Sequence, residues 1–363
     1  MKSAILGMGE WWPETIRDNS AWPSDFGQRD GAHQDMSAYR DFQAGQGGDP
    51  CDAITARHLA IEAGDPFAGS TSRRVADADM DACEAEARAS RAALDDARLK
   101  AEDIDYILSW ALVPERVTPP SATRVAHLIG ATRAIGIGMD IGCATIVGQL
   151  LFAASLIESG RARNILVTGS HLATRAFPVQ HPASPGFGDV AVAVVVGPSE
   201  RAGILSTFGV SHGDYYDTVA WRRSKDNDTP WYQAGGPMYL GSYDRDGFAQ
   251  IFRDTIRFGR DTVVEAARRS GVSLPSIDVL ASVQPRRWVP VGIAEALGLS
   301  PDRAPQTYDQ LAHLGACGVV TNLLEARRRG LLSRRPGGEP ATVALYAQGA
   351  GFTRAATILR WVA

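Results

Sequence analysis

A short stretch of the chain reads Asp140-Ile141-Gly142-Cys143-Ala144, and it predicts a strand-to-helix junction. An apolar run over residues 144–158 follows it and ends near Gly160, as expected of a buried helix. The next segment, Ile165-Leu166-Val167-Thr168-Gly169, is typical of a strand that is buried on both faces. Such strands, alternating with helices, predict an α/β fold.

The order of predicted helices and strands recurs in the second half of the chain. This half contains predicted helices at about 247–270, at 289–297 and after Gly318, and predicted strands at 277–281 and near 342–348 and 355–361. We therefore divide the chain into an N-terminal half, residues 1–200, and a C-terminal half, residues 201–363.

One segment, from about residue 20 to residue 64, fits this alternation poorly. Gly45, Gly47 and Gly48 stand there among polar residues with little periodicity. The segment is expected to be a surface loop or a partly ordered insertion. The alternative is a lid or flap that shapes the substrate site.

Composition limits the classes of partner. The formal net charge is −4 and the sequence pI is about 6.0, so nothing indicates nucleic acid or an anionic membrane as a partner. The four cysteines form no Cys-x-x-Cys pair, so neither a metal site nor a redox dithiol is expected. Without a signal-peptide pattern or an apolar run of about 18 residues, we expect a cytoplasmic protein.

Cys143 is the candidate nucleophile. A cysteine at a helix N-terminus lies in a field that favours its thiolate form. Neighbouring backbone N–H groups could also stabilise an oxyanion. Most lone buried cysteines are structural, however, so the residue has to be judged with its surroundings.

These surroundings resemble the ketoacyl synthase III family of the thiolase superfamily. The matching segments, in order along the chain, are Gly9–Pro13 with Glu14 and Asn19, Gly69–Arg74, Asp103–Asp105, Pro120–Ala122, Leu128–Ala131, Cys143 itself, Glu158–Gly160, Gly186–Asp189 and Ala347–Thr353. Only residues 20–64 and about 215–245 are poorly covered. The resemblance implies a thiolase fold, with two pseudo-repeated halves forming a layered αβαβα body. The nucleophile would lie in the first half, and a histidine and a glycine loop in the second.

The family pairs its cysteine with a histidine and an asparagine, and this chain departs from both. Counting along the matching segments places Val283 where the family has the histidine of its His-Gln-Ala-Asn motif. Gln284 keeps the second position of that motif, whereas Arg286 replaces the motif's own asparagine. His313 stands where the second motif, Gly-Asn-Thr, has its asparagine.

The surroundings of His313 resemble a histidine motif in one branch of the family, whose members act in natural-product pathways. This branch includes starter-unit-specifying enzymes of aromatic polyketides and acyltransferases that modify sugars. Some of its members carry His-x-Gly-x-x-Asp at this point, and Gly318 stands where that Asp would be. The resemblance therefore implies a catalytic dyad of Cys143 and His313. The other histidines of interest, His127, His171 and His181, are expected to be structural.

The resemblance also implies binding residues. The backbone N–H groups of Cys143 and Ala350 would form the oxyanion hole. Gly349, Gly351, Gln284 and Arg73 would contact substrate, although Arg73 could equally form a surface ion pair. The acyl donor would be a thioester of coenzyme A or of an acyl carrier protein's phosphopantetheine. No permanently bound cofactor is expected, and the resemblance implies a homodimer.

Three functions remain open at this stage. The first is an acyltransferase that moves an acyl group through Cys143 to an oxygen or nitrogen of a small molecule in secondary metabolism. The second is a decarboxylative ketoacyl synthase III that condenses a starter acyl group with a malonyl carrier protein. The third is a non-catalytic subunit of a heterodimeric condensing enzyme. Release of carbon dioxide separates the first two, and native mass tests the third.

Overall fold

Two β-sheets form the framework of the protein in a computed structural model, which describes residues 2–26, 48–177, 179–200, 203–223, 230, 232–235, 238–333, 335 and 337–361. The first sheet has the strand order β1 (Lys2–Trp11), β7 (Asp189–Ser199), β6 (Ile165–Leu172), β4 (Tyr106–Ala111) and β5 (Ile135–Gly138). The second has the order β11 (Val279–Ser282), β12 (Thr342–Gly349), β13 (Thr353–Arg360) and β8 (Ile204–Ser211). Each sheet mixes parallel and antiparallel pairs.

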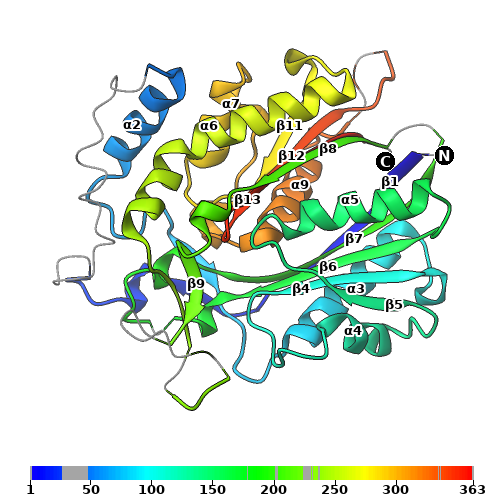
Figure 1. The fold of residues 1–363 in the computed structure, drawn as a ribbon, viewed down its shortest axis with the longest axis horizontal. Helices are drawn as coiled ribbons and strands as arrows, with labels where there is room; N and C mark the ends of the chain where they lie inside the picture. Colours follow the sequence, from blue (N-terminus) through cyan, green and yellow to red (C-terminus); the bar gives the residue numbers. More distant parts are fainter. Residues whose placement is uncertain are drawn as a thin grey trace.

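Two helices, α5 (Thr145–Glu158) and α9 (Gly318–Arg328), lie between the sheets (Figure 1). Their apolar side chains share one core with the inward-facing residues of both sheets. A helix that is apolar on most sides needs such surroundings, and residues 145–150 of α5 are all buried.

Further helices cover the outer face of each sheet. Helices α3 (Ala82–Ala97) and α4 (Ser121–Ile129) pack on the first sheet, and α6 (Arg245–Ser270) and α7 (Val289–Ala296) on the second. The result is the predicted αβαβα layering, so the α/β prediction and the thiolase-like layers are confirmed. None of the described helices is long and apolar enough to cross a membrane.

Short elements complete the fold. They are β2 (Ile16–Asp18), β3 (Ser72–Arg74), β9 (Val219–Arg222), β10 (Tyr239–Ser242) and α8 (Tyr308–Leu311). Strands β2 and β3 pair with each other, as do β9 and β10.

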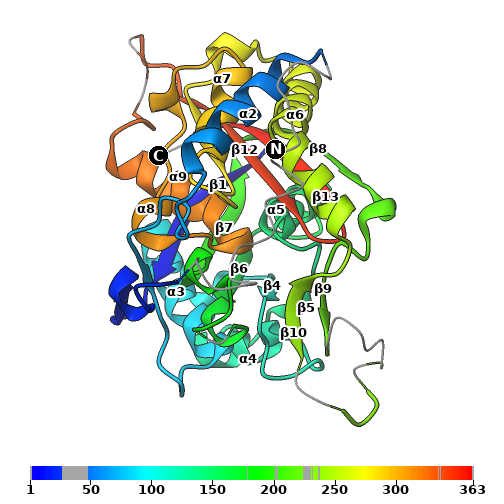
Figure 2. The same cartoon turned by 90° about the vertical axis from the view of Figure 1, so that its left-hand side faces the viewer.

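The poorly patterned segment differs from its prediction. Residues 50–62 form a helix, α2 (Pro50–Glu62), which lies beside α6 and α7 (Figure 2). Asp49 caps it by accepting a hydrogen bond from the Cys51 N–H and forms a two-point ion pair with Arg260 of α6, at 2.7 and 2.8 Å. The prediction of a loop is therefore wrong for this part, whereas residues 27–47 lie outside the described residues.

Candidate active site

Cys143 is held at the start of α5 by a hydrogen-bonded turn. The Asp140 carboxylate accepts hydrogen bonds from the Gly142 N–H at 2.8 Å and from the Trp110 indole at 3.0 Å. Thr145 accepts from the Ile141 N–H at 2.9 Å. Gly142 has φ +64°, a conformation that favours glycine. The turn therefore fixes the cysteine backbone before the helix begins.

The glycine loop after β12 touches this turn. A Cβ added at Gly142 would lie 2.8 Å from the Ala350 carbonyl oxygen, and a Cβ at Gly349 would overlap the Cys143 amide nitrogen. Only residues without a side chain allow two backbones to approach so closely. The structure thus brings Cys143, Gly349 and Ala350 together, as the sequence analysis expects.

His313 completes the pair of predicted catalytic residues. Its Nε2 lies 3.7 Å from the Cys143 Sγ. Its backbone is bound on both sides, because the His313 N–H donates to the Gly186 carbonyl at 2.9 Å and its carbonyl accepts from the Gly188 N–H at 3.1 Å. The dyad therefore joins two distant parts of the chain, and a third part, residues 186–188, holds the backbone of His313.

The hydrogen bond at the other ring nitrogen assigns the tautomer of His313. Nδ1 lies 3.1 Å from the backbone carbonyl oxygen of Gln284, which can only accept. Nδ1 therefore carries the hydrogen, and Nε2 presents a lone pair to Cys143. The carboxylate expected from the related branch is replaced here by this carbonyl, since Gly318 stands at that position.

Burial keeps both members of the dyad uncharged. Burial lowers the pKa of His313 to about 4, aided by the nearby Arg286, although the bond to Gln284 opposes it. Burial and the charge of Asp140 raise the pKa of the Cys143 thiol to about 12. The expected thiolate is therefore not the resting form, because the loss of hydration outweighs the helix dipole.

Two predicted binding residues face elsewhere. The Gln284 side chain is fully buried, donating to Thr307 Oγ1 and the Ala312 carbonyl and accepting from the Thr307 and Asn322 N–H groups. The substrate-binding role predicted for its side chain is therefore corrected. Its backbone carbonyl orients His313 instead, a role that residue type alone does not reveal.

Arg73 is likewise a structural residue. It is fully buried, and its guanidinium donates to the Pro185 carbonyl at 2.9 and 3.1 Å, to Ser70 Oγ at 3.0 Å and to Asn19 Oδ1 at 2.8 Å. The guanidinium also lies 4.5 Å from the ring centroid of Trp22. Neither a substrate contact nor a surface ion pair fits this placement, so both interpretations of Arg73 are wrong.

A second histidine, His171, lies near the dyad. Its Nδ1 donates to the Gly188 carbonyl at 2.8 Å, and its ring centroid is 5.7 Å from that of His313. Burial, followed by the nearby His313, lowers its pKa to about 3. Gly315 makes room for it, because a Cβ there would lie 2.8 Å from the His171 Nε2. His171 was expected to be structural, and its ring lies at the edge of the cavity beside the dyad.

A cavity of about 790 Å³ extends from the dyad. Its reacting end is lined by Cys143, His171, His313 and the glycine loop, including Gly351. Its far end is lined by α2 and the first turns of α6. This volume can hold a small-molecule ligand or the arm of a thioester.

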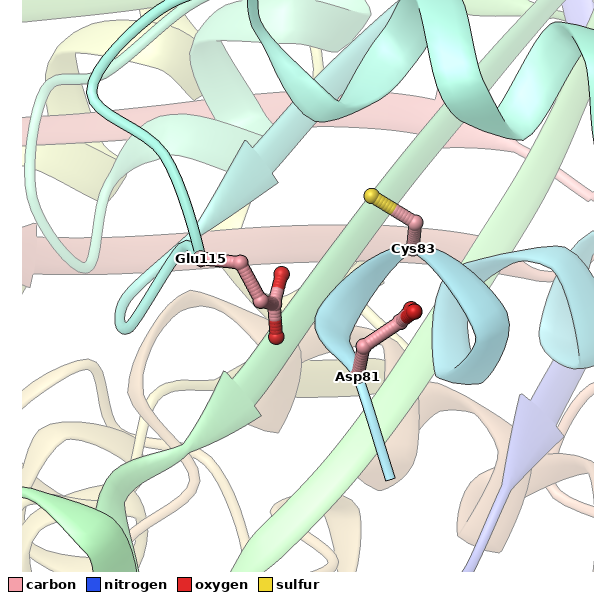
Figure 3. A group of neighbouring side chains, drawn as sticks. All are labelled: Asp81, Cys83 and Glu115. Carbon is pink, nitrogen blue, oxygen red and sulfur yellow. The ribbon is translucent and has the colours of Figure 1, made fainter. Parts of the chain in front are cut away.

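Asp81, Cys83 and Glu115 form a separate cluster (Figure 3), with one potential ligand atom from each lying within 4.8 Å of the others. Its contacts are those of a helix cap. Asp81 accepts from the Glu84 N–H at 2.6 Å, and Glu115 from the Ala82 N–H at 2.8 Å. Burial, aided by neighbouring carboxylates, raises the pKa of Cys83 to about 12. The hydrogen bonds at the start of α3 therefore account for the positions of the two carboxylates.

The five layers, with a cysteine at the N-terminus of the buried helix α5, define a thiolase-fold protein. The family model described as 3-oxoacyl-[acyl-carrier-protein] synthase III matches residues 138–213, and its C-terminal counterpart matches residues 267–361. The beta-ketoacyl-[acyl-carrier-protein] synthase III of Sphingopyxis alaskensis is 30% identical over 79% of this chain and 86% of its own length. That of Roseobacter denitrificans is 27% identical over 99% of each chain. The chain therefore belongs to the 3-oxoacyl-[acyl-carrier-protein] synthase III family of enzymes.

Solved structures agree with this fold. The 3-oxoacyl-(acyl carrier protein) synthase III of Pseudomonas aeruginosa superposes with a TM-score of 0.78, at 22% identity, over 100% of this chain and 99% of that one. The priming β-ketosynthase of the R1128 polyketide biosynthetic pathway gives a TM-score of 0.75 at 21% identity, over 99% and 96%. At these identities the likeness supports the fold alone.

Proposed function

We propose that the protein is an acyltransferase that carries an acyl group on Cys143 and passes it to an oxygen or nitrogen of a small molecule, as in natural-product biosynthesis. One observation carries the proposal. The Nε2 lone pair of an uncharged His313 points at the Cys143 Sγ, so this histidine is arranged to take a proton. Acyl transfer to a hydroxyl or amine needs such a general base.

In the first step, His313 takes the thiol proton as Sγ attacks the carbonyl of an acyl thioester. The bond between the acyl carbon and the sulfur of coenzyme A or phosphopantetheine breaks, and the imidazolium returns the proton to that sulfur. The backbone N–H groups of Cys143 and Ala350 would stabilise the oxyanion. Covalent catalysis thereby divides one displacement into two easier ones.

In the second step, the acceptor enters beside the acyl-enzyme. His313 takes the proton of its hydroxyl or amine as the oxygen or nitrogen attacks the acyl carbon. The carbon–sulfur bond to Cys143 breaks, and the proton passes to Sγ. No permanently bound cofactor is required by this sequence.

Decarboxylative condensation is the second candidate, and the similarity to beta-ketoacyl-[acyl-carrier-protein] synthases III favours it. That reaction forms an enolate, which is stabilised by hydrogen-bond donors. Val283 stands where motif counting places the family's histidine, and it is fully buried and apolar. His313 Nε2 is a hydrogen-bond acceptor and not a donor. The geometry around Cys143 therefore supports proton removal better than enolate stabilisation.

The loading step is tested by intact mass. Wild type and Cys143→Ala are exposed to a panel of acyl-coenzyme A and acyl-carrier-protein thioesters. We expect a gain of one acyl mass in wild type and none in the variant, and the reactive thioester identifies the donor. Equal mass gain in both proteins would place the acyl group on another residue and refute the proposed nucleophile.

We also propose a homodimer formed through β5, an end strand of the first sheet. Ile135 and Ile137 on this strand are 55% and 39% exposed, and Leu151 and Phe152 on α5 are 42% and 54% exposed. An open strand edge with apolar side chains is suited to pairing. Analytical ultracentrifugation should show a dimer that Ile137→Lys converts to monomer. A chain that assembles only with a different subunit would favour the heterodimer alternative.

A further inference from the structure

A second uncharged imidazole stands beside the dyad and has no part in the two steps described above. The side chain of His171 lines the reacting end of the cavity together with Cys143 and His313. Trp110 and Phe187 lie beside its ring in nearly parallel planes, at centroid distances of 6.4 and 6.1 Å. Such neighbours cover the faces of a ring, so a ligand in the cavity meets the edge of the His171 imidazole.

The edge of His171 presents a hydrogen-bond acceptor. Its Nδ1 donates to the Gly188 carbonyl at 2.8 Å, so the neutral ring keeps its hydrogen there and Nε2 carries a lone pair. Burial, aided by the nearby His313, lowers the pKa of His171 to about 3, so the ring stays neutral. Among the residues that the structure describes, none donates a hydrogen bond to this Nε2. A donor supplied by a ligand would therefore be stabilising.

The reacting end thus offers two lone pairs, one on His171 Nε2 and one on His313 Nε2. The centroids of the two rings are 5.7 Å apart. An NH₂ group that donates to two acceptors holds them about 5 Å apart, because each hydrogen bond is about 3 Å long and the two N–H bonds diverge. The separation of the rings is compatible with one NH₂ group between them.

The number of hydrogens on the attacking atom decides which acceptor uses both lone pairs. A primary amine carries two hydrogens on its nitrogen, of which one passes to His313 and the other is retained. An alcohol or a secondary amine carries only one, which His313 takes, and His171 is left without a donor. We propose that His171 accepts the retained N–H, and that the acyl acceptor of this protein is a primary amine. The inference rests on the proposed function, in which the acceptor is an oxygen or a nitrogen.

The transfer to a primary amine balances without a further reactant. The nitrogen attacks the acyl carbon, and the carbon–sulfur bond to Cys143 breaks. His313 takes one amine proton and returns it to Sγ, so the products are an amide and the free thiol. Water also has two hydrogens, so hydrolysis is the competing reaction. An amine with a carbon skeleton is favoured over water because Leu112, Val219 and Phe248 give the cavity an apolar lining.

Deacylation of the isolated acyl-enzyme, followed by intact mass, tests the inference with two probes. O-methylhydroxylamine and N,O-dimethylhydroxylamine are both small and uncharged at neutral pH, but the first has two N–H bonds and the second has one. The ratio of their rates with a free acyl thioester gives their intrinsic preference. We expect the acyl-enzyme to exceed this ratio by about tenfold, as one additional hydrogen bond implies. The same ratio in both reactions would overturn the inference.

Two variants separate the contact with the acceptor from the role of His171 in the fold. In His171→Asn the amide nitrogen replaces Nδ1 and can donate to Gly188, but no atom replaces Nε2. In His171→Gln the amide oxygen replaces Nε2 as an acceptor, but the donor to Gly188 is lost. We expect His171→Asn to lose the additional preference and His171→Gln to retain part of it. The opposite order would show that His171 acts only through Gly188. His127→Asn, at an exposed position in α4, is the control.

Loading of the same variants separates this inference from the proposed function. Both should acylate Cys143 within about threefold of the wild-type rate, because His171 meets only the acceptor. Normal loading of wild type with transfer at the intrinsic ratio would overturn the inference and leave the acyltransferase proposal standing. Failure of wild type to acylate Cys143 would refute both. The comparison of the two probes on wild type stands even if a variant fails to fold.

Discussion

At one end of the cavity two backbone segments touch, whereas at the other end side chains of separate helices face one another. The first contact, between Gly142 and the loop at Gly349, has no space for an added atom. The far wall is made of side chains such as Leu59 and Phe252, interrupted by Glu62. The reaction therefore depends on contacts between backbone segments, whereas the choice of ligand depends on side chains. Changes at the first end should affect rates strongly, and changes at the second should affect binding.

The largest effect is expected from His313→Ala. Both the loading of Cys143 and the transfer step should slow by about 10²–10⁴-fold, because the general base is lost. Time-resolved intact mass measures both steps. His127→Gln, at an exposed position in α4, is the control. Wild-type rates of loading and transfer in His313→Ala would show that another group removes the proton.

Gly349→Ala should have the next largest effect. The added methyl group overlaps the Cys143 amide, so the two backbones must separate and the oxyanion hole is disturbed. We expect acylation to slow by about 10²–10³-fold, as for a lost oxyanion donor. Gly213→Ala is the matched control, since a Cβ there meets nothing within 4 Å. Normal acylation by Gly349→Ala would mean that the close contact has no catalytic role.

The pH dependence of acylation sharpens the comparison, because only the reacting end contains the buried dyad. The pKa of His313 is lowered to about 4, so the residue remains a neutral base above that pH and is protonated below it. The rate should therefore hold from pH 8 to about 5 and then fall about tenfold per pH unit below about 4. Stopped-flow acylation measures the profile. A midpoint near 6.5 would indicate a histidine exposed to solvent.

The smallest effect on rate is expected from Leu59→Ala on the far wall. Leu59 is buried, and its truncation should lower the free energy of unfolding by about 2–3 kcal/mol. Acylation should stay within about threefold of wild type because no reacting group moves. Chemical denaturation and intact mass test the two parts. Ile61→Ala on the same helix, 74% exposed, should change neither. A hundredfold loss of acylation in Leu59→Ala would remove the distinction between the two ends.

Sequence patterns predict the layers because the apolar strands and the helix after Cys143 can be buried in few other arrangements. The Cys143–His313 pair follows from motif counting and is brought together in space. The role of Gln284 cannot be predicted from its residue type, because its backbone carbonyl contacts His313 and any residue has such a carbonyl. The form of the Cys143 thiol also differs from expectation, since the dipole can be inferred from the chain whereas the extent of burial cannot.

Helix α2 shows a signal that periodicity alone misses. Asp49-Pro50 is a good helix start, with a capping carboxylate followed by a proline at the first position. The glycine-rich residues before it have little periodicity, so periodicity alone does not predict this helix. Arg73 illustrates the opposite difficulty, because an arginine in a motif gives no sign that all its donors are used inside the protein. His171 and His313 lie far apart in sequence, so only the fold brings their rings together.

The most direct test of the central claim starts from isolated enzyme acylated on Cys143. One portion is mixed with a panel of hydroxyl and amine acceptors, and another with malonyl carrier protein. The acyl mass on the protein and the release of carbon dioxide are followed together. We predict loss of the acyl group to an acceptor without carbon dioxide, and much slower loss in His313→Ala. Loss only with malonyl carrier protein, with an equal amount of carbon dioxide, would contradict the account and identify a condensing enzyme.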